Sequence, residues 1–134
     1  MLAAKVNNVV QGLRYRIFNN QDVEFLDYTS YSGRAVYCRS LCFLLAKACQ
    51  DICPGCKVTM RRPISKGYFC ELLKPDGSET TGTDIDRIRK RMRELVLKGS
   101  AFHRHEVKTA DAVALFKSLG YEDKVKLIST SGEI

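Results

Sequence analysis

Three cysteines stand close together in the stretch "AKACQDICPGCKV", which covers residues 46–58. Cys49, Cys53 and Cys56 follow the spacing C-x3-C-x2-C, which holds an iron–sulfur cluster in radical enzymes. The last two form C-P-G-C, a C-x-x-C pair that suits a redox-active dithiol or one half of a zinc site. The spacing therefore points to three kinds of chemistry: a cluster, a zinc ion or disulfide exchange.

The positions of the cysteines along a helix offer a simpler interpretation. A helix turns by about 100° per residue, so four of the six cysteines fall within about 60° of one another. These four are Cys38, Cys42, Cys49 and Cys53. Cysteine packs as a small hydrophobic residue in protein cores. We therefore expect this cysteine stripe to serve packing, with C-P-G-C marking the end of the helix.

The chemical alternatives lack their usual supporting residues. A zinc site needs a second ligand pair, but Cys70 stands alone, and His103 and His105 have no further partner at ligand spacing. A reactive dithiol lies at a helix N-terminus, where the dipole lowers the thiol pKa, whereas C-P-G-C follows a helical pattern. An iron–sulfur radical enzyme needs a barrel that 134 residues cannot supply. The sequence favours packing over zinc or redox chemistry, and we expect no bound metal and no cofactor in this chain.

The composition is that of a globular domain, or of one domain and a fragment of another. Of the 134 residues, 45% are hydrophobic and 28% are charged, and the sequence has only 3 prolines. No stretch approaches the ~20 apolar residues that a membrane helix needs, so we expect no membrane partner. The first residues lack the apolar run of a signal peptide. We therefore expect a cytoplasmic protein whose cysteines are free thiols or metal ligands rather than disulfides.

The net charge of +7 is compatible with RNA or a small anionic ligand as a partner. The segment "RIRKRMREL", residues 87–95, is either the solvated face of a helix or a surface that contacts phosphates. We expect any RNA binding to be weak, non-specific and electrostatic. The candidate contact residues are Arg61, Arg62, Lys66, Arg87, Arg91, Lys98 and Arg104.

The spacing of apolar residues along the chain predicts an α+β fold. Apolar residues at helical spacing predict a long, buried central helix over 34–53, which Pro54 and Gly55 stop. It should pack on an antiparallel sheet of strands 57–61, 67–73 and 101–107, after short strands within 5–28. Further helices are expected at 84–98 and 110–119, with Thr83 and Thr109 as caps. Residues 122–130 should form a strand or a last helical turn.

Two long segments resemble the editing region of threonyl-tRNA synthetases. They are "VYCRSLCFLLAKACQDICPGCKVTMRRPISKGYFCEL" and "DIDRIRKRMRELVLKGSAFHRHEVKTADAVALFKSLGYEDKVKLI". Upstream, "VNNVVQGLRYRIFNNQDVEFLD" is similar to the closing strands of a TGS domain, a small β-grasp module. The resemblance covers about 5–130 and implies two regions. Residues 1–31 would be the end of a TGS domain, and residues 34–134 a module like the second additional domain of threonyl-tRNA synthetase.

In that family, H-x-x-x-H on the central helix, with a later C-x-x-x-H, hydrolyses mischarged aminoacyl-tRNA or binds zinc in alanyl relatives. The resemblance places Arg39 and Phe43 at the two histidine positions. Arginine stays protonated near neutral pH and phenylalanine cannot carry a proton, so the implied editing site is degenerate. Phe43 should then fill the former cleft, and Arg39 should form either a helix salt bridge or a contact with an anion.

One branch of the family implies a particular parent protein. "RSLCF" and "ISKGYFCEL" resemble the version of this module that is fused ahead of a P-loop kinase domain in uridine kinase-like proteins. No G-x-x-x-x-G-K-[ST] loop occurs here, so ATP and magnesium would bind only in a downstream kinase domain. We expect a non-catalytic accessory or regulatory region of a nucleoside kinase, partnered by that domain. The alternative is an RNA-binding or editing-type module of a threonyl-tRNA synthetase-like protein.

Overall fold

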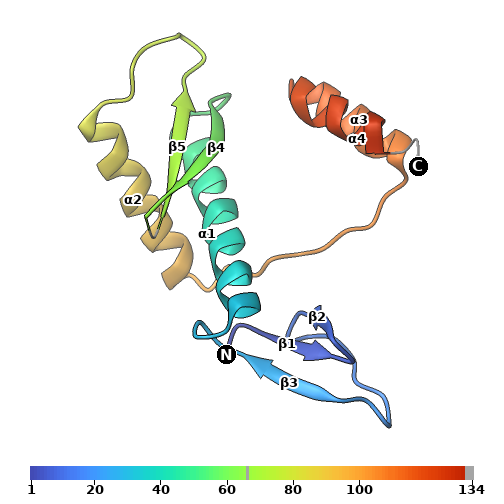
Figure 1. Cartoon of the computed structure of the whole chain (residues 1–134). Helices are drawn as coiled ribbons and strands as arrows, with labels where there is room; N and C mark the ends of the chain where they lie inside the picture. Colours follow the sequence, from blue (N-terminus) through green and yellow to red (C-terminus); the bar gives the residue numbers. More distant parts are fainter. Residues whose placement is uncertain (66, 132–134) are drawn as a thin grey trace. The chain divides into compact units, whose positions relative to one another are not determined.

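The computed structural model describes residues 1–65 and 67–131, which form two antiparallel sheets and four helices. In chain order (Figure 1) the elements are β1 (Ala3–Val6), β2 (Val9–Gln11), β3 (Val23–Leu26), α1 (Tyr31–Ile52), β4 (Lys57–Ile64), β5 (Gly67–Leu73), α2 (Gly82–Leu97), α3 (Thr109–Ser118) and α4 (Glu122–Ser131). The chain divides into two compact units, Met1–Ser100 and Ala101–Ile134. Mixed helices and antiparallel sheets agree with the predicted α+β class.

The first sheet has the strand order β2-β1-β3 and confirms the short antiparallel strands predicted within 5–28. Asn7 and Asn8 have φ angles of 47° and 65°, and they join β1 to β2 in the two-residue turn that such angles favour. Residues 12–22 add no strand to this sheet. The interpretation of the sheet as the end of a TGS domain stays a prediction, as does the boundary between 31 and 34.

Helix α1 confirms the predicted central helix but begins earlier than expected. The Ser30 hydroxyl accepts a hydrogen bond from the Gly33 N–H at 3.1 Å, which caps the helix at Tyr31. The prediction of a buried helix is wrong for most of its length, since its buried residues are Gly33, Ala48 and Cys49. Only the C-terminal half of α1 lies in the core cluster that it shares with α2 and the second sheet.

The second sheet is the hairpin of β4 and β5, which confirms strands near 57–61 and 67–73. The predicted third strand at 101–107 is wrong: these residues form no helix or strand and belong to the second unit. Alternating side chains are compatible with a strand, but a strand also needs a partner for its backbone hydrogen bonds, and the described residues provide none for 101–107.

Helix α2 runs antiparallel to α1 beside the hairpin (Figure 1). The core of this unit is a small cluster of Ala48, Cys49, Cys56, Ile88 and Leu95. The predicted cap at Thr83 is wrong, because Thr81 and Asp84 form the capping box of α2. Gly99 follows the helix with φ of 65°, as expected of a glycine that ends a helix.

The second unit is a pair of packed helices, α3 and α4. Helix α3 matches the predicted helix at 110–119, but Lys108 is its N-cap and no side chain caps it, so the predicted Thr109 cap is wrong. Gly120 follows with φ of 74°. Helix α4 is ten residues long and includes residues 122–130. Of the two alternatives that the sequence allowed there, the helical one is therefore confirmed and the strand is wrong. No helix among the described residues is long and apolar enough to cross a membrane.

Candidate functional site

Arg39 and Phe43 lie one turn apart on the exposed side of α1. The Arg39 Nε donates a hydrogen bond of 3.2 Å to the Ala35 carbonyl oxygen of its own helix. Within the described residues Arg39 forms no salt bridge, so the predicted helix salt bridge is absent from this part of the chain. Phe43 is 65% exposed, and the prediction that it fills a cavity is therefore wrong.

A small apolar groove of about 240 Å³ lies between α1, β5 and α2. Its lining residues are Tyr28, Tyr37, Cys38, Leu41, Cys42, Leu45, Gly67, Tyr68, Cys70 and Met92. Neither Arg39 nor Phe43 lines it, and it contains no carboxylate or imidazole. The groove can accept an apolar or aromatic group, but it offers no side chain suited to activate water near neutral pH.

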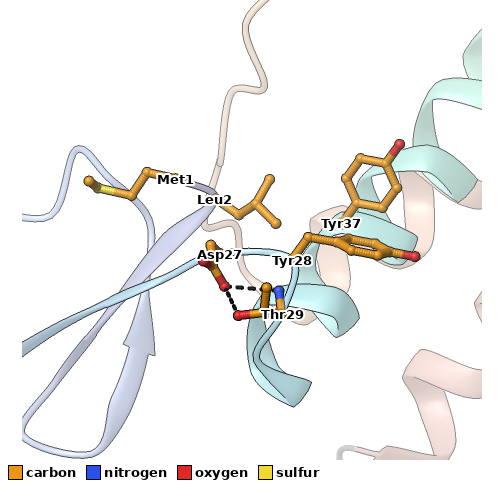
Figure 2. Close-up of a pocket in the computed structure, with 6 residues that line it drawn as sticks. All are labelled: Met1, Leu2, Asp27, Tyr28, Thr29 and Tyr37. Atoms are coloured by element: carbon orange, nitrogen blue, oxygen red, sulfur yellow. Dashed lines mark hydrogen bonds between the residues drawn. The ribbon is translucent and has the colours of Figure 1, made fainter.

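A larger, open hollow of about 520 Å³ lies beside the loop that joins β3 to α1. Figure 2 shows its lining residues, which are Met1, Leu2, Asp27, Tyr28, Thr29 and Tyr37. The rings of Tyr28 and Tyr37 meet edge to face, with centroids 5.1 Å apart. The Asp27 carboxylate accepts hydrogen bonds from the Thr29 hydroxyl and N–H, which lower the pKa of Asp27.

The sequence analysis predicted short strands within 5–28 and a helix from 34, and it assigned no structured loop to "DYTS", so it missed this hollow. Asp, Thr and Ser in a row directly before a helical pattern are typical of a turn with a capping residue. That signal could have placed Asp27 and Thr29 in a structured loop. The same signal could not have shown that Tyr37, ten residues after Asp27, would line the hollow with Asp27 and Thr29.

The cationic residues of α2 form the strongest candidate contact surface. Arg87, Lys90 and Arg91, which we call the α2 stripe, line a hollow of about 230 Å³ with Ile52 and Glu94. Arg91 is fixed there by Asp51 at 2.9 Å and Glu94 at 3.1 Å. These carboxylates raise the pKa of Arg91. Arg87 and Lys90 form no ion pair with any other described residue. The Arg87 guanidinium and the Lys90 ammonium group are therefore available to an anion.

Among the other predicted contact residues that the structure describes in the first unit, none lines this hollow. Arg61 pairs with Glu71 across the hairpin at 2.7 Å, and Arg62 lies exposed beyond a bulge in β4. Lys66 lies outside the described residues. Lys98 is the C-cap of α2. Arg104 belongs to the second unit, where it pairs with Glu106 at 2.7 Å.

The cysteine stripe is only partly a core feature. Cys49 is buried in the core cluster and the partly exposed Cys53 packs against it, so the predicted packing role is confirmed for these two. Cys38 and Cys42 are partly exposed and lie outside the cluster. Burial raises the pKa of Cys49 to about 11. No group of three or more His, Cys, Asp or Glu residues suited to a metal ion occurs among the described residues. The predicted absence of metal awaits elemental analysis of protein purified without chelator.

Comparison with known proteins shows that the chain is similar in sequence to aminoacyl-tRNA synthetases. No protein-family model matches it. It is similar to the threonine–tRNA ligases of Thermobifida fusca (32% identity over 133 residues), Parabacteroides distasonis (31% over 129) and Porphyromonas gingivalis W83 (28% over 129). These alignments cover 98%, 96% and 96% of this chain.

The chain spans about one fifth of the length of these relatives, which is 19% for the Thermobifida protein and 20% for the other two. The similarity confirms the resemblance to threonyl-tRNA synthetases that the sequence motifs indicated. It favours the synthetase-like alternative over the kinase-linked interpretation, which stays a prediction.

Proposed function

We propose that this chain is a non-hydrolysing, RNA-contacting accessory module of a threonyl-tRNA synthetase-like protein. The observation that carries the proposal is similarity along 96–98% of the chain to a segment of threonine–tRNA ligases. A threonine–tRNA ligase is by its name an enzyme that acts on tRNA. A module of common descent with a surplus of positive charge is suited to contact the same polyanion.

The α2 stripe supports an electrostatic contact with phosphates. Arg91 is held in place by two carboxylates. Arg87 and Lys90 line the same hollow and have no carboxylate partner among the described residues. Cations on one face of a helix bind phosphates mainly by releasing counterions, and this term weakens as salt rises. The contact should therefore add affinity without reading the RNA sequence.

Binding of a tRNA by the full chain tests the stripe. We expect the double variant Arg87→Gln/Lys90→Gln to reduce the slope of log affinity against log salt by about 1.5, since two phosphate contacts are lost. The matched control is Arg89→Gln/Arg93→Gln, which removes the same charge from the opposite side of α2 and should change the slope less. Equal losses in both variants, or tight binding that persists at high salt, would contradict the proposal.

The absence of hydrolysis is the second part of the proposal. A guanidinium at position 39 stays protonated, and a benzyl group at position 43 neither binds a metal nor moves a proton. We expect seryl-tRNA to lose its amino acid no faster with the chain than in buffer. Turnover above background that disappears in Arg39→Ala would show that the site is active.

A second candidate function rests on two motifs, "RSLCF" and "ISKGYFCEL". They motivate the proposal that the module serves a uridine kinase-like protein as an accessory or regulatory region. The coding sequence beyond residue 134 separates the candidates. A G-x-x-x-x-G-K-[ST] loop there would favour the kinase, and a class II synthetase core would favour the first proposal.

A further inference from the structure

Two thiols lie together in the turn that joins α1 to β4. Cys53 is the C-cap of α1, and the Cys56 N–H donates a hydrogen bond of 3.1 Å to the Cys53 carbonyl oxygen. Pro54 is the second residue of this turn, and Gly55 is the third, with φ of 82°. Proline followed by a residue of positive φ fits a type II turn. The first and last residues of the turn are both cysteines.

The geometry of such a turn suits a disulfide. A β-turn keeps the Cα atoms of its first and fourth residues within about 7 Å, and disulfides join Cα atoms about 4.4–6.8 Å apart. The hydrogen bond from the Cys56 N–H to the Cys53 carbonyl oxygen, 3.1 Å long, closes this turn and keeps the two residues close. The pair can therefore be joined without moving the backbone far.

The side chain of Gln50 holds the turn in this conformation. Its Nε2 donates to the Cys56 carbonyl oxygen at 3.0 Å, and its Oε1 accepts from the Gly55 N–H at 3.3 Å. A Cβ atom on Gly55 would come within 3.3 Å of the Pro75 ring, so the turn also packs closely against the loop after β5. These contacts come from groups other than the two thiols, and the turn is therefore in place before any sulfur–sulfur bond forms.

The two thiols differ in their access to solvent. Cys56 is 1% exposed, whereas Cys53 is partly exposed. Burial raises the pKa of the Cys56 thiol, which slows its direct reaction with any reagent in solution. An oxidant should therefore meet Cys53 first, and Cys56 should act second, from inside the turn.

We propose that Cys53 and Cys56 form a reversible disulfide modification site that a low-molecular-weight disulfide, such as oxidised glutathione, can oxidise. The Cys53 thiolate attacks one sulfur of the reagent, which breaks its S–S bond and releases one glutathione thiolate. The Cys56 thiolate then attacks the Cys53 sulfur and releases the second glutathione. The two protein thiols are oxidised to one disulfide, and one glutathione disulfide is reduced to two thiols that take up the two protons.

The test is a redox titration of the full chain in mixtures of reduced and oxidised glutathione. Free thiols are alkylated at each ratio, and the modified peptides are mapped by mass spectrometry. We expect two of the six cysteines to become protected together, both in the peptide that contains C-P-G-C, and reduced glutathione to restore them. Six alkylated cysteines at every ratio, or a bond between Cys42 and Cys70 instead, would overturn the proposal.

Single variants test the order of the two steps. Cys56→Ser should accumulate glutathione on Cys53, because the second thiol is missing, whereas Cys53→Ser should carry no adduct at the buried Cys56. The matched control Cys38→Ser/Cys42→Ser should form the disulfide as the unmodified chain does. No adduct on Cys53 in Cys56→Ser, or a free adduct on Cys56 in Cys53→Ser, would contradict the mechanism. The titration of the unmodified chain does not depend on the folding of any variant.

Discussion

Single residues of this chain show how far chemistry can be inferred from residue type. Arg39 and Phe43 cannot act as base or metal ligand wherever they point, because neither side chain has a lone pair for the task near neutral pH. Their environment was a different question. The structure shows both on the exposed side of α1, and neither lines the apolar groove. The residue types exclude base and metal-ligand roles for these two side chains, whereas their contacts depend on the fold.

Asp84 provides a prediction about pH at the same scale. Lys74 lies 2.6 Å from its carboxylate, and the Thr81 N–H and hydroxyl donate to it. These contacts, with Lys74 the largest, hold the pKa of Asp84 well below its ordinary value of 3.8. A carboxylate whose pKa is lower in the folded state stabilises the fold above the unfolded pKa, and this contribution is lost as pH falls through the folded pKa.

We therefore expect Asp84→Asn to lower the melting temperature at pH 7, where the charge is present in the native protein. The difference from the unmodified chain should shrink as the pH falls below 3.8. Thermal unfolding followed by circular dichroism over this range measures it. Asp86→Asn is the matched control, because its pair with Arg89 is exposed on both sides and should contribute little. A pH-independent difference would point to packing instead of charge.

At the scale of the element, the start of α2 is set by a capping box. The Thr81 hydroxyl accepts from the Asp84 N–H at 3.3 Å, and the Asp84 carboxylate accepts from the Thr81 N–H at 2.9 Å. Replacing a capping threonine by alanine costs about 1 kcal/mol. We expect Thr81→Ala to lower the free energy of unfolding in urea by that amount. Thr83→Ala, two residues inside the helix, is the control, and an equal loss there would contradict the assignment of the cap.

The entry into α1 depends on the absence of a side chain. A Cβ atom on Gly33 would lie only 1.8 Å from the Asp27 carbonyl oxygen and 2.8 Å from the Ser30 hydroxyl oxygen. We expect Gly33→Ala to lower the free energy of unfolding by about 1–3 kcal/mol, because the loop before α1 must move. Urea unfolding is the measurement. Gly82→Ala is the matched control at the start of α2, since nothing lies within 4 Å of its added Cβ, and it should be neutral or slightly stabilising.

At the scale of the whole molecule, the two units are joined by a segment without regular structure. Residues 101–108 form no helix or strand, and their side chains are exposed. Proteases cut such segments first, because cleavage needs an extended, accessible backbone. We expect brief trypsin treatment to cut first after Arg104 or Lys108 and to leave two fragments. The variant Arg104→Gln/Lys108→Gln should lose this early cut. A first cut inside α1 or α2 would contradict the division into two units.

Several features of the fold follow from local chemistry that the amino-acid sequence already displays. Asn7 and Asn8 form the turn between β1 and β2, Pro54 and Gly55 follow the end of α1, and Gly99 and Gly120 follow α2 and α3 with positive φ. Each of these depends on the conformations that a residue and its neighbours allow. The resemblance to threonyl-tRNA synthetases was also carried by the sequence alone, through residue types in a fixed order over nearly the whole chain.

The burial of each face and the pairing of distant side chains became clear from the three-dimensional fold. The alternating residues 101–107 form no strand, because a strand exists only where a neighbour completes its hydrogen bonds. The cap of α2 is Thr81 and not, as the sequence had predicted, Thr83. Lys74, directly after the hairpin, pairs with the Asp84 carboxylate of this capping box. Apart from Gly33 near its start, helix α1 is buried only at Ala48 and Cys49, which belong to the core cluster shared with α2. These outcomes depend on contacts between residues far apart in the chain, which no local pattern contains.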